Sequence, residues 1–390
     1  MVEIVIYMSY KLLEISAFYT KYLEYFYQKN PNLENLDYNN HLKFLLSDCF
    51  AECDFIHPEL HKLGVESKIV IYNDERIQRK WKEDYKNNTL FEIVCEQIKE
   101  YQPDVIFFSD MTILNEEQYN HIRNMLDNKC KFVGWHFTIV NDSNKNIFKC
   151  FDQIYTGNKY ILTLIKPYCK DVRLLYHGFE TSIFNKVNPK TRTNKIVFPG
   201  SIFMGEEIHN NRIDMFGKLY SKNIPCEFYG NIYGSFLPHT PKQLVKWILQ
   251  KNKPSKDRIT TEKLLRKNIK QSVFGLDYYR VLANYSICVN QHAAIACTGS
   301  GNMRMFEATG MGACLLTDYR EENVDLFVPD EEIVVYKNYD ELIEKAEYLI
   351  NNPAAASDIA KRGQQRTLNT HSYKQKAEKM NEYILELFRK

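Results

Sequence analysis

The chain lacks several signatures that would assign its chemistry at once. Its ten cysteines show no paired spacing of the kind that binds zinc. No Asp-x-Asp pair, the usual acidic clamp for a metal ion, occurs anywhere in the sequence. No Gly-x-Gly-x-x-Gly follows the apolar segments that end at Tyr7 and Phe198, which argues against a nicotinamide enzyme. The net charge is only +2, so nucleic acid is not predicted as a partner.

Signals for secretion and membrane insertion are missing as well. No apolar run approaches the roughly 20 residues that a membrane-spanning helix needs. The start, Met1–Tyr7, resembles a strand rather than a signal peptide, because it has no basic region and no long apolar region. Single cysteines scattered through apolar runs are typical of a reducing compartment. We therefore expect a cytoplasmic protein, with the inner face of the membrane as an alternative location.

Strand and helix patterns alternate along both halves of the chain. Asp104–Ser109, for example, is an apolar run typical of strands buried in parallel sheets. A length of 390 residues suggests two domains. We predict an α/β fold with two Rossmann-like doubly wound domains. The predicted parts are a first domain at 1–184, a linker at 185–194, a second domain at 195–372 and a terminal helix at 373–390.

The first half contains two long stretches that are expected to be helical. Tyr10–Gln28 carries aromatic residues at helical spacing, and these favour core or inter-domain packing over a sugar-stacking platform. Leu42–Leu63 is expected to be a helix that Gly64 ends. Lys131–Trp135 is predicted to be a strand that places His136 at its carboxyl end.

A basic insertion interrupts the alternation at 235–271. It carries ten Lys and Arg residues against only Asp257 and Glu262, and apolar residues lie among its early lysines. This pattern is typical of an amphipathic helix on an anionic membrane or polymer. A solvated insertion between sheet elements explains it equally well.

The stretch with the clearest chemistry begins in the small-residue loop Cys297–Gly301. A short helix pattern with Arg304 and Glu307 follows, and then the apolar strand Ala313–Leu316. A loop that leads into a helix presents free backbone N–H groups and the positive end of a dipole, which suits a phosphate. A Glu one turn into that helix can accept hydrogen bonds from sugar hydroxyls. The pattern indicates a nucleotide-sugar site, although any α/β domain can contain such a loop and helix.

About 180 residues of the second half resemble the retaining glycosyltransferases of the two-Rossmann (GT-B) type. The likeness is to glycosyl transferases group 1, in the family-4-like branch similar to spore-maturation glycosyltransferases. Four stretches carry it in chain order: Phe198-Pro199-Gly200-Ser201 with Arg212; Tyr279–Asn290 with His292; Asn302-x-Arg304-x-Phe306-Glu307 through Asp318; and Glu331–Tyr336 through His371-Ser372-Tyr373. The resemblance implies two domains facing across a cleft, with a C-terminal helix that crosses back to the first domain.

The resemblance also implies roles for individual residues. Glu307 matches the Glu that holds the nucleotide ribose in the family, whereas the family's first Glu falls at Gly299 here. The catalytic candidates are His136, facing the transferred sugar, and Arg304, meeting the diphosphate. The donor-binding candidates share positions at the turns of the second domain: Gly200, Ser201, Arg212, Gly301, Asn302, Met303 and Glu307.

Each candidate has a structural alternative. Arg304 could form a structural salt bridge, Glu307 could cap a helix or lie in a buried pair, and His136 could simply be hydrogen-bonded structure. His292 and His371 are interpreted as structural residues. The strand-end and loop residues Asp110 and Asp142 are weaker candidates for contact with the acceptor.

The absence of an Asp-x-Asp clamp favours a metal-independent reaction in which Arg304 and helix-terminal amides stabilise the leaving phosphate. We predict a hexosyltransferase-like enzyme for surface polysaccharide biosynthesis that uses a UDP- or GDP-sugar as donor and needs no cofactor. Its acceptor would be a glycan, a glycolipid or a protein. Retention of anomeric configuration is implied by the resemblance alone. A sugar-nucleotide epimerase of the same fold and a non-catalytic sugar-nucleotide or glycan-binding protein are the alternatives.

Overall fold

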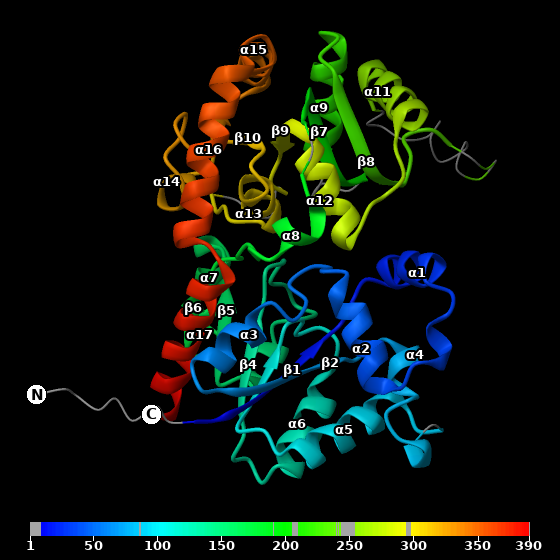
Figure 1. Ribbon diagram of the computed structural model, residues 1–390, viewed down its shortest axis with the longest axis vertical. Coiled ribbons are helices and arrows are strands. Elements are labelled where there is room, and N and C mark those ends of the chain that lie inside the picture. The colour runs from blue at the N-terminus through cyan, green and yellow to red at the C-terminus, as the bar shows by residue number, and fades with distance from the viewer. Residues whose placement is uncertain are drawn as a thin grey trace, which may run out of the picture. The chain divides into compact units, whose positions relative to one another are not determined.

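The structure is a computed structural model that describes residues 9–85, 87–189, 191–204, 210–238, 240, 242, 254–293 and 298–389. The chain divides into two compact units, each described here by itself. The first unit comprises Met1–His177 and Ser372–Lys390, and the second comprises Gly178–His371. Both are parallel sheets flanked by helices (Figure 1). The strand predicted at Val2–Tyr7 lies outside the described residues.

The first unit contains a six-stranded parallel sheet in the order β2-β1-β3-β4-β5-β6. Its strands are β1 (Lys11–Ser16), β2 (Glu66–Ile71), β3 (Val105–Phe108), β4 (Lys131–Trp135), β5 (Gln153–Thr156) and β6 (Val172–Leu174). Its helices are α1 (Thr20–Lys29), α2 (Tyr38–Ser47), α3 (Ile56–Lys62), α4 (Glu75–Gln78), α5 (Leu90–Tyr101), α6 (Glu116–Met125), α7 (Lys159–Ile165) and α17 (Tyr373–Phe388). The expected return of the terminal helix is confirmed, because α17 belongs to this unit and packs on α3.

The second unit contains a five-stranded parallel sheet in the order β11-β10-β9-β7-β8. Its strands are β7 (Thr193–Phe203), β8 (Cys226–Tyr233), β9 (Tyr285–Asn290), β10 (Cys314–Asp318) and β11 (Val334–Tyr336). Its helices are α8 (Ile183–Val187), α9 (Asn210–Ser221), α11 (Lys256–Asn268), α12 (Gly275–Asn284), α13 (Met303–Gly310), α14 (Asn323–Leu326), α15 (Tyr339–Asn351) and α16 (Pro353–Thr370). The polar run 185–194, predicted as a linker, includes the end of α8 and the start of β7.

The helix predicted over Tyr10–Gln28 is wrong in its first part, because Lys11–Ser16 is the strand β1. This strand pairs with β2 on one side and β3 on the other. A position in the middle of a sheet satisfies the backbone on both sides and outweighs the local helical pattern. The expectation of core packing is confirmed for Tyr22, Phe26 and Tyr27, whereas Tyr19 is 72% exposed.

The single helix predicted over Leu42–Leu63 is also wrong, because the chain forms α2 and α3 with a break between them. Three residues of the break, Cys49, Ala51 and Cys53, have positive φ angles of 58°, 54° and 45°, which a helix does not permit. Phe50, between them, is buried and stacks on Tyr22 with ring centroids 3.7 Å apart. Burial of this ring compensates for the interrupted helix.

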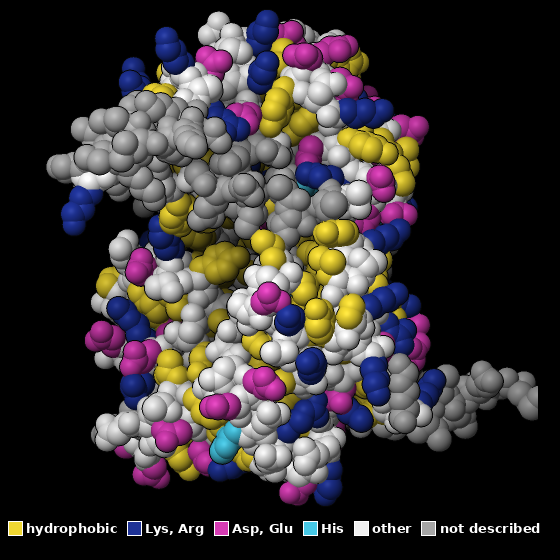
Figure 2. All heavy atoms as spheres, turned by 180° about the vertical axis from the view of Figure 1, so that it is seen from behind, with side chains coloured by type: hydrophobic (Ala, Val, Ile, Leu, Met, Phe, Trp, Pro, Cys, Tyr) yellow, Lys and Arg dark blue, Asp and Glu magenta, His cyan; other side chains and the backbone are white. Residues whose placement is uncertain are grey.

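The surface and the cysteines give few further clues. Basic and acidic side chains are interspersed on the face drawn in Figure 2, in keeping with the net charge of +2. The nine cysteines in the described part of the chain are free, and Cys297 lies outside it. None of the described helices combines the length and the apolar character needed to cross a membrane.

Candidate functional site

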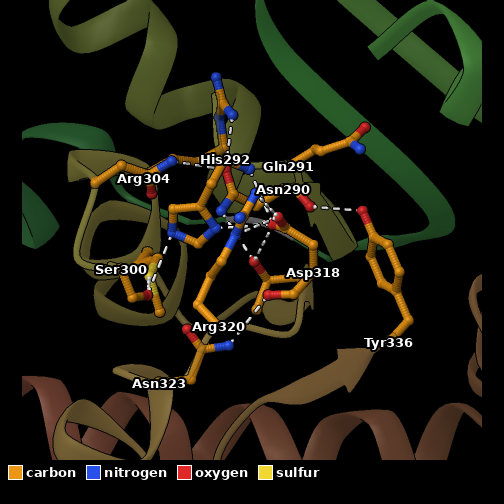
Figure 3. A network of polar contacts seen from close by, with 12 residues as sticks. Asn290, Gln291, His292, Ser300, Arg304, Asp318, Arg320, Asn323 and Tyr336 are labelled. Atoms are coloured by element: carbon orange, nitrogen blue, oxygen red, sulfur yellow. Dashed lines mark hydrogen bonds and ion pairs between the residues drawn. The ribbon is translucent and has the colours of Figure 1, made fainter. Parts of the chain in front are cut away.

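Polar side chains gather where the strands of the second sheet end. Asn290 is the last residue of β9 and Asp318 the last of β10, while Gly200 and Ser201 lie near the end of β7. The carboxyl ends of parallel strands meet at one edge, where open α/β sheets bind ligands. Figure 3 shows the resulting network of side chains.

Arg304, in the first turn of α13, reaches back to this edge. Its Nη1 donates to Asn290 Oδ1 at 2.8 Å, and its guanidinium lies 4.5 Å from the centroid of the Phe198 ring. A Cβ atom on Gly200 would collide with Arg304 Nη2. Because Gly200 has no side chain, the guanidinium of Arg304 has room beside it.

Arg212, from α9, brings a second positive charge to the same ring. Its guanidinium lies 5.5 Å from the centroid of Phe198, and its Nη1 donates to the carbonyl of Ser201 at 2.7 Å. Burial and the neighbouring charge of Arg304 lower the pKa of Arg212 to about 9. An arginine keeps its proton at neutral pH, so the lowered pKa reflects the cost of placing a buried cation beside a like charge.

Neither guanidinium forms an ion pair with any residue that the structure describes. Arg304 has the neutral amide of Asn290 as its acceptor, and Arg212 has the carbonyls of Ser201 and Gln291. The Nε atoms of both arginines are buried and make no hydrogen bond within the described residues. Within the described part of the chain the two arginines form no ion pair, although the charge of Asp318 acts on Arg212. Such a pair of cations is suited to an anion such as a diphosphate.

The loop before α13 positions the remaining donor-binding candidates. Asn302 is the N-cap residue of α13, and its Nδ2 donates to Asn290 Oδ1 at 3.1 Å. Gly301 has a φ of +88°, which favours glycine, and its amide lies 3.4 Å from Met305 Sδ. Met303, the first residue of α13, is half-buried. The structure thus connects Asn302 directly to the strand edge that holds Arg304, with Gly301 and Met303 as its neighbours in the chain.

Glu307 is buried one turn further along α13. The hydroxyl of Tyr278 donates to its Oε2 at 2.6 Å, and the hydroxyl of Tyr279 lies 3.5 Å from its Oε1. Burial and the charge of Glu307 raise the pKa of Tyr278, and the positive charge of Arg304 opposes that rise. Glu307 therefore accepts from tyrosine hydroxyls here, and its role toward a ribose stays a prediction.

His292, Asp318 and Ser300 form a buried chain of contacts behind the arginines. His292 Nδ1 lies 2.7 Å from Asp318 Oδ1, and Ser300 Oγ lies 3.3 Å from His292 Nε2. Burial raises the pKa of Asp318, but His292 and Arg320 outweigh it, so the pKa lies below its ordinary value. Ser300 is 0% exposed. Its hydroxyl also donates to Met305 Sδ at 3.1 Å, so within the described residues this serine–histidine–aspartate order holds the loop.

His136 lies in the first unit, at the carboxyl end of β4 as predicted. Its side chain is buried, its Nε2 lies 3.3 Å from the carbonyl of Ile139, and its ring packs on Phe148. Asp110, at the end of β3, is half-exposed and accepts from Thr112. Asp142 is exposed and pairs with Lys145 at 2.5 Å. The catalytic role of His136 stays a prediction.

Sequence reasoning missed four residues of the site: Phe198, Tyr278, Asn290 and Gln291. Asn290 could have been predicted as a site residue, because a polar residue directly after the apolar run Ile287–Val289 marks a strand end. Phe198 looks like any apolar strand residue, and only the structure reveals the two cations beside it. No metal-binding group of three or more His, Cys, Asp or Glu side chains occurs in the described ranges. Metal independence stays a prediction.

The basic insertion is partly neutralised where it is described. Arg258 Nε and Nη2 donate to the two carboxylate oxygens of Asp214 at 2.8 and 2.6 Å. Arg266 pairs with Glu262, and Lys270 pairs with Glu227. The stretch 243–253, which includes most of the predicted amphipathic helix, lies outside the described residues.

Comparisons with known proteins concern the fold and part of the sequence. Residues 215–382 match a family described as glycosyl transferase-like. Solved structures match nearly the whole chain. A glycosyltransferase from Rickettsia africae is 12% identical with a TM-score of 0.54, and 98% of this chain and 99% of that chain are covered. Sucrose-phosphate synthase from Thermosynechococcus elongatus is 12% identical with a TM-score of 0.55, at 97% and 99% coverage. The Anabaena protein HepE in complex with UDP-glucose is 11% identical with a TM-score of 0.55, at 97% and 100% coverage.

The chain therefore has the α/β fold with two parallel-sheet domains that GT-B glycosyltransferases share. The family match covers residues 215–382, which is less than half of the chain, and the solved structures show its fold. A search of curated protein sequences finds no match. The likeness to the spore-maturation branch stays a prediction.

Proposed function

We propose that this protein transfers a sugar from a nucleoside-diphosphate sugar to a glycan, glycolipid or protein acceptor. The observation that carries the proposal is the pair of arginines beside Phe198, whose acceptors among the residues that the structure describes are all neutral. A diphosphate would supply the missing negative charge. The fold neighbour HepE has been solved with UDP-glucose and with UDP, which supports a uridine nucleotide as the first probe.

In the proposed reaction the bond between the anomeric carbon and the diphosphate oxygen breaks. The acceptor hydroxyl oxygen forms the new bond to that carbon, and its proton passes to the departing phosphate. Arg304 and Arg212 stabilise the charge that develops on the diphosphate. The course without a metal ion and with retained configuration is part of the proposal, as is a cytoplasmic location. Contact with an anionic membrane through residues 235–271 is a separate proposal, tested by vesicle binding that falls with salt.

The experiment is a panel of UDP-, GDP- and TDP-sugars, assayed for binding by calorimetry and for hydrolysis or transfer with and without EDTA. We expect at least one donor to bind and to turn over in both conditions. Failure of the whole panel to bind overturns the proposal, and loss of turnover in EDTA overturns its metal-independent form. Product analysis separates the alternatives, because an epimerase converts the donor without an acceptor and a binding protein shows no turnover.

A further inference from the structure

Asn290 is the polar residue at which the network around Arg304 converges. It is 0% exposed, and its side chain makes three hydrogen bonds (Figure 3). Its Nδ2 donates to Thr317 Oγ1 at 3.0 Å. Its Oδ1 accepts from Arg304 Nη1 at 2.8 Å and from Asn302 Nδ2 at 3.1 Å. One buried amide thus joins strands β9 and β10 to the start of α13.

The donor-only character of arginine fixes the direction of every bond in this group. A guanidinium has no acceptor, so Asn290 must turn its oxygen toward Arg304. The same oxygen then forces Asn302 to present its NH₂ group to Asn290. The Oδ1 of Asn302 is left facing away, buried and without a hydrogen-bond donor among the described residues. A buried acceptor is stable only when a partner donates to it, so a ligand group placed beside this oxygen would have to be a donor.

The neutrality of Asn290 has a second consequence. A carboxylate at this position would accept the same two hydrogen bonds but would also neutralise Arg304. Elsewhere in the second unit buried or half-buried arginines do pair with acids, as Arg320 does with Asp318 and Arg258 with Asp214. At this edge an amide holds the arginine instead, so the guanidinium is fixed in position while its charge remains available.

We propose that Asn290 is a positioning residue that orients the hydrogen-bond donors and acceptors of the donor site. It anchors Arg304 without cancelling its charge, and it turns the Asn302 oxygen toward a hydroxyl of the bound nucleotide sugar. The ligand at this edge therefore presents an anionic phosphate and, next to it, a hydroxyl that donates. This inference rests on the proposed function and assigns residues to its donor site.

The first test is Asn290→Asp, which keeps an acceptor for Arg304 and Asn302 but adds a negative charge. We expect the affinity for UDP, measured by calorimetry, to fall about tenfold or more, because the carboxylate competes with the diphosphate for Arg304. The dependence of UDP affinity on salt should also become shallower than in the wild type, because the net charge of the site is reduced. A merely structural role for Asn290 would leave this salt dependence unchanged.

The matched control is Asn381→Asp in the first unit. Asn381 is also buried, and its Oδ1 accepts from the hydroxyl of Tyr10 at 3.0 Å. The substitution introduces a buried carboxylate away from the second sheet, so it should leave the UDP affinity and its salt dependence as in the wild type. GDP replaces UDP as the probe in all three proteins if the wild type does not bind UDP.

A second variant, Asn302→Ala, tests the other half of the inference even if Asn290→Asp does not fold. Asn302 is half-buried in a loop, so its truncation should be tolerated. We expect the affinity for UDP-glucose to fall about fivefold to tenfold, because one hydrogen bond to the ligand is lost. The salt dependence should match the wild type, because no charge changes.

The outcomes separate this inference from the proposed function. A wild type that binds no nucleoside diphosphate or nucleotide sugar overturns both. A wild type that binds, together with Asn290→Asp at unchanged affinity and unchanged salt dependence, overturns the role of Asn290 alone. Unchanged affinity of Asn302→Ala for the bound nucleotide sugar overturns the assignment of the Asn302 oxygen.

Discussion

The two units bury charge in different ways. In the first unit Lys376 is buried against Glu52 at 2.5 Å, and Glu52 also accepts from His177 at 2.9 Å. Burial raises the pKa of Glu52, but Lys376 and His177 outweigh it and hold the pKa well below its ordinary value. In the second unit Arg304 and Arg212 have only neutral acceptors among the described residues.

The comparison distinguishes charges that stabilise the fold from charges that we propose bind a ligand. Taking a charge out of water is costly unless an opposite charge accompanies it. Lys376 and Glu52 satisfy each other and fix α17 to the first unit. In the described ranges the two arginines have no such partner, and the proposed anion site at the edge of the second sheet is based on this difference.

The largest expected effect comes from breaking the pair in the first unit. Glu52→Gln leaves Lys376 buried without a counter-charge, and we expect a loss of about 3–5 kcal/mol in the free energy of unfolding. Urea denaturation followed by circular dichroism measures it. The double variant Glu52→Gln/Lys376→Met removes both charges and should recover much of the loss. A loss below about 1 kcal/mol for the single variant would contradict the pairing.

Removing a charge from the second unit should lower activity rather than stability. Arg304→Gln should lower kcat/KM about 100-fold or more while leaving the free energy of unfolding unchanged or slightly higher. Donor kinetics and thermal unfolding provide the two measurements. The control is Arg258→Gln, which breaks an ion pair with Asp214 in which neither Arg304 nor Arg212 takes part and should leave kcat/KM intact. A strongly destabilised Arg304→Gln with normal kinetics would make Arg304 a structural residue.

The space beside Arg304 provides a finer test. A methyl group in Gly200→Ala would displace the guanidinium, and we expect about a tenfold weaker affinity for the donor. Some stability should be lost as well, because Gly200 has a φ of +159°. Gly64→Ala is the converse control, because Gly64 has a φ of +82° and open space around it. That variant should lose about 1 kcal/mol of stability and keep its affinity. Calorimetry with the donor compares the two, and equal affinities would exclude the proposed role of Gly200.

The smallest expected effect is on the response of the first unit to acid. Burial lowers the pKa of His136, although its contacts with Ile139 and Thr138 and the charge of Asp110 oppose this. The unfolded chain takes up a proton at the ordinary histidine pKa of about 6.5, while the folded chain resists it. The contribution of His136 is therefore fully present above that pH and is lost as the pH falls through this range.

The measurement compares wild type and His136→Gln by thermal unfolding at about pH 8 and about pH 5. The difference in stability between the two pH values should be smaller in the variant. His177 in the same unit also has a lowered pKa because of burial, so the variant should remove only part of the acid sensitivity. An identical loss in both proteins would show that His136 takes up its proton equally well in the folded chain.

The parallel α/β architecture of both halves can be predicted from the amino-acid sequence. Runs such as Val105–Phe108 and Cys314–Leu316 are apolar on both faces, and this follows directly from burial between two layers of helices. Arg304, Asn302 and Gly200 could likewise be placed at strand and helix ends from local pattern. The residues next to each of them in the sequence are sufficient to predict a turn there.

The contacts that these residues make depend on the folding of distant segments against one another. β1 was hidden because Glu14 interrupts its apolar run, and the buried contact of Glu14 with His57, 43 positions away in the chain, makes that residue acceptable in a strand. Similarly, Phe198, Arg212, Asn290 and Arg304 come from four separate segments. The hydrogen bonds and ring contacts that join them form across strands and helices, and no local pattern encodes which donor will face which acceptor.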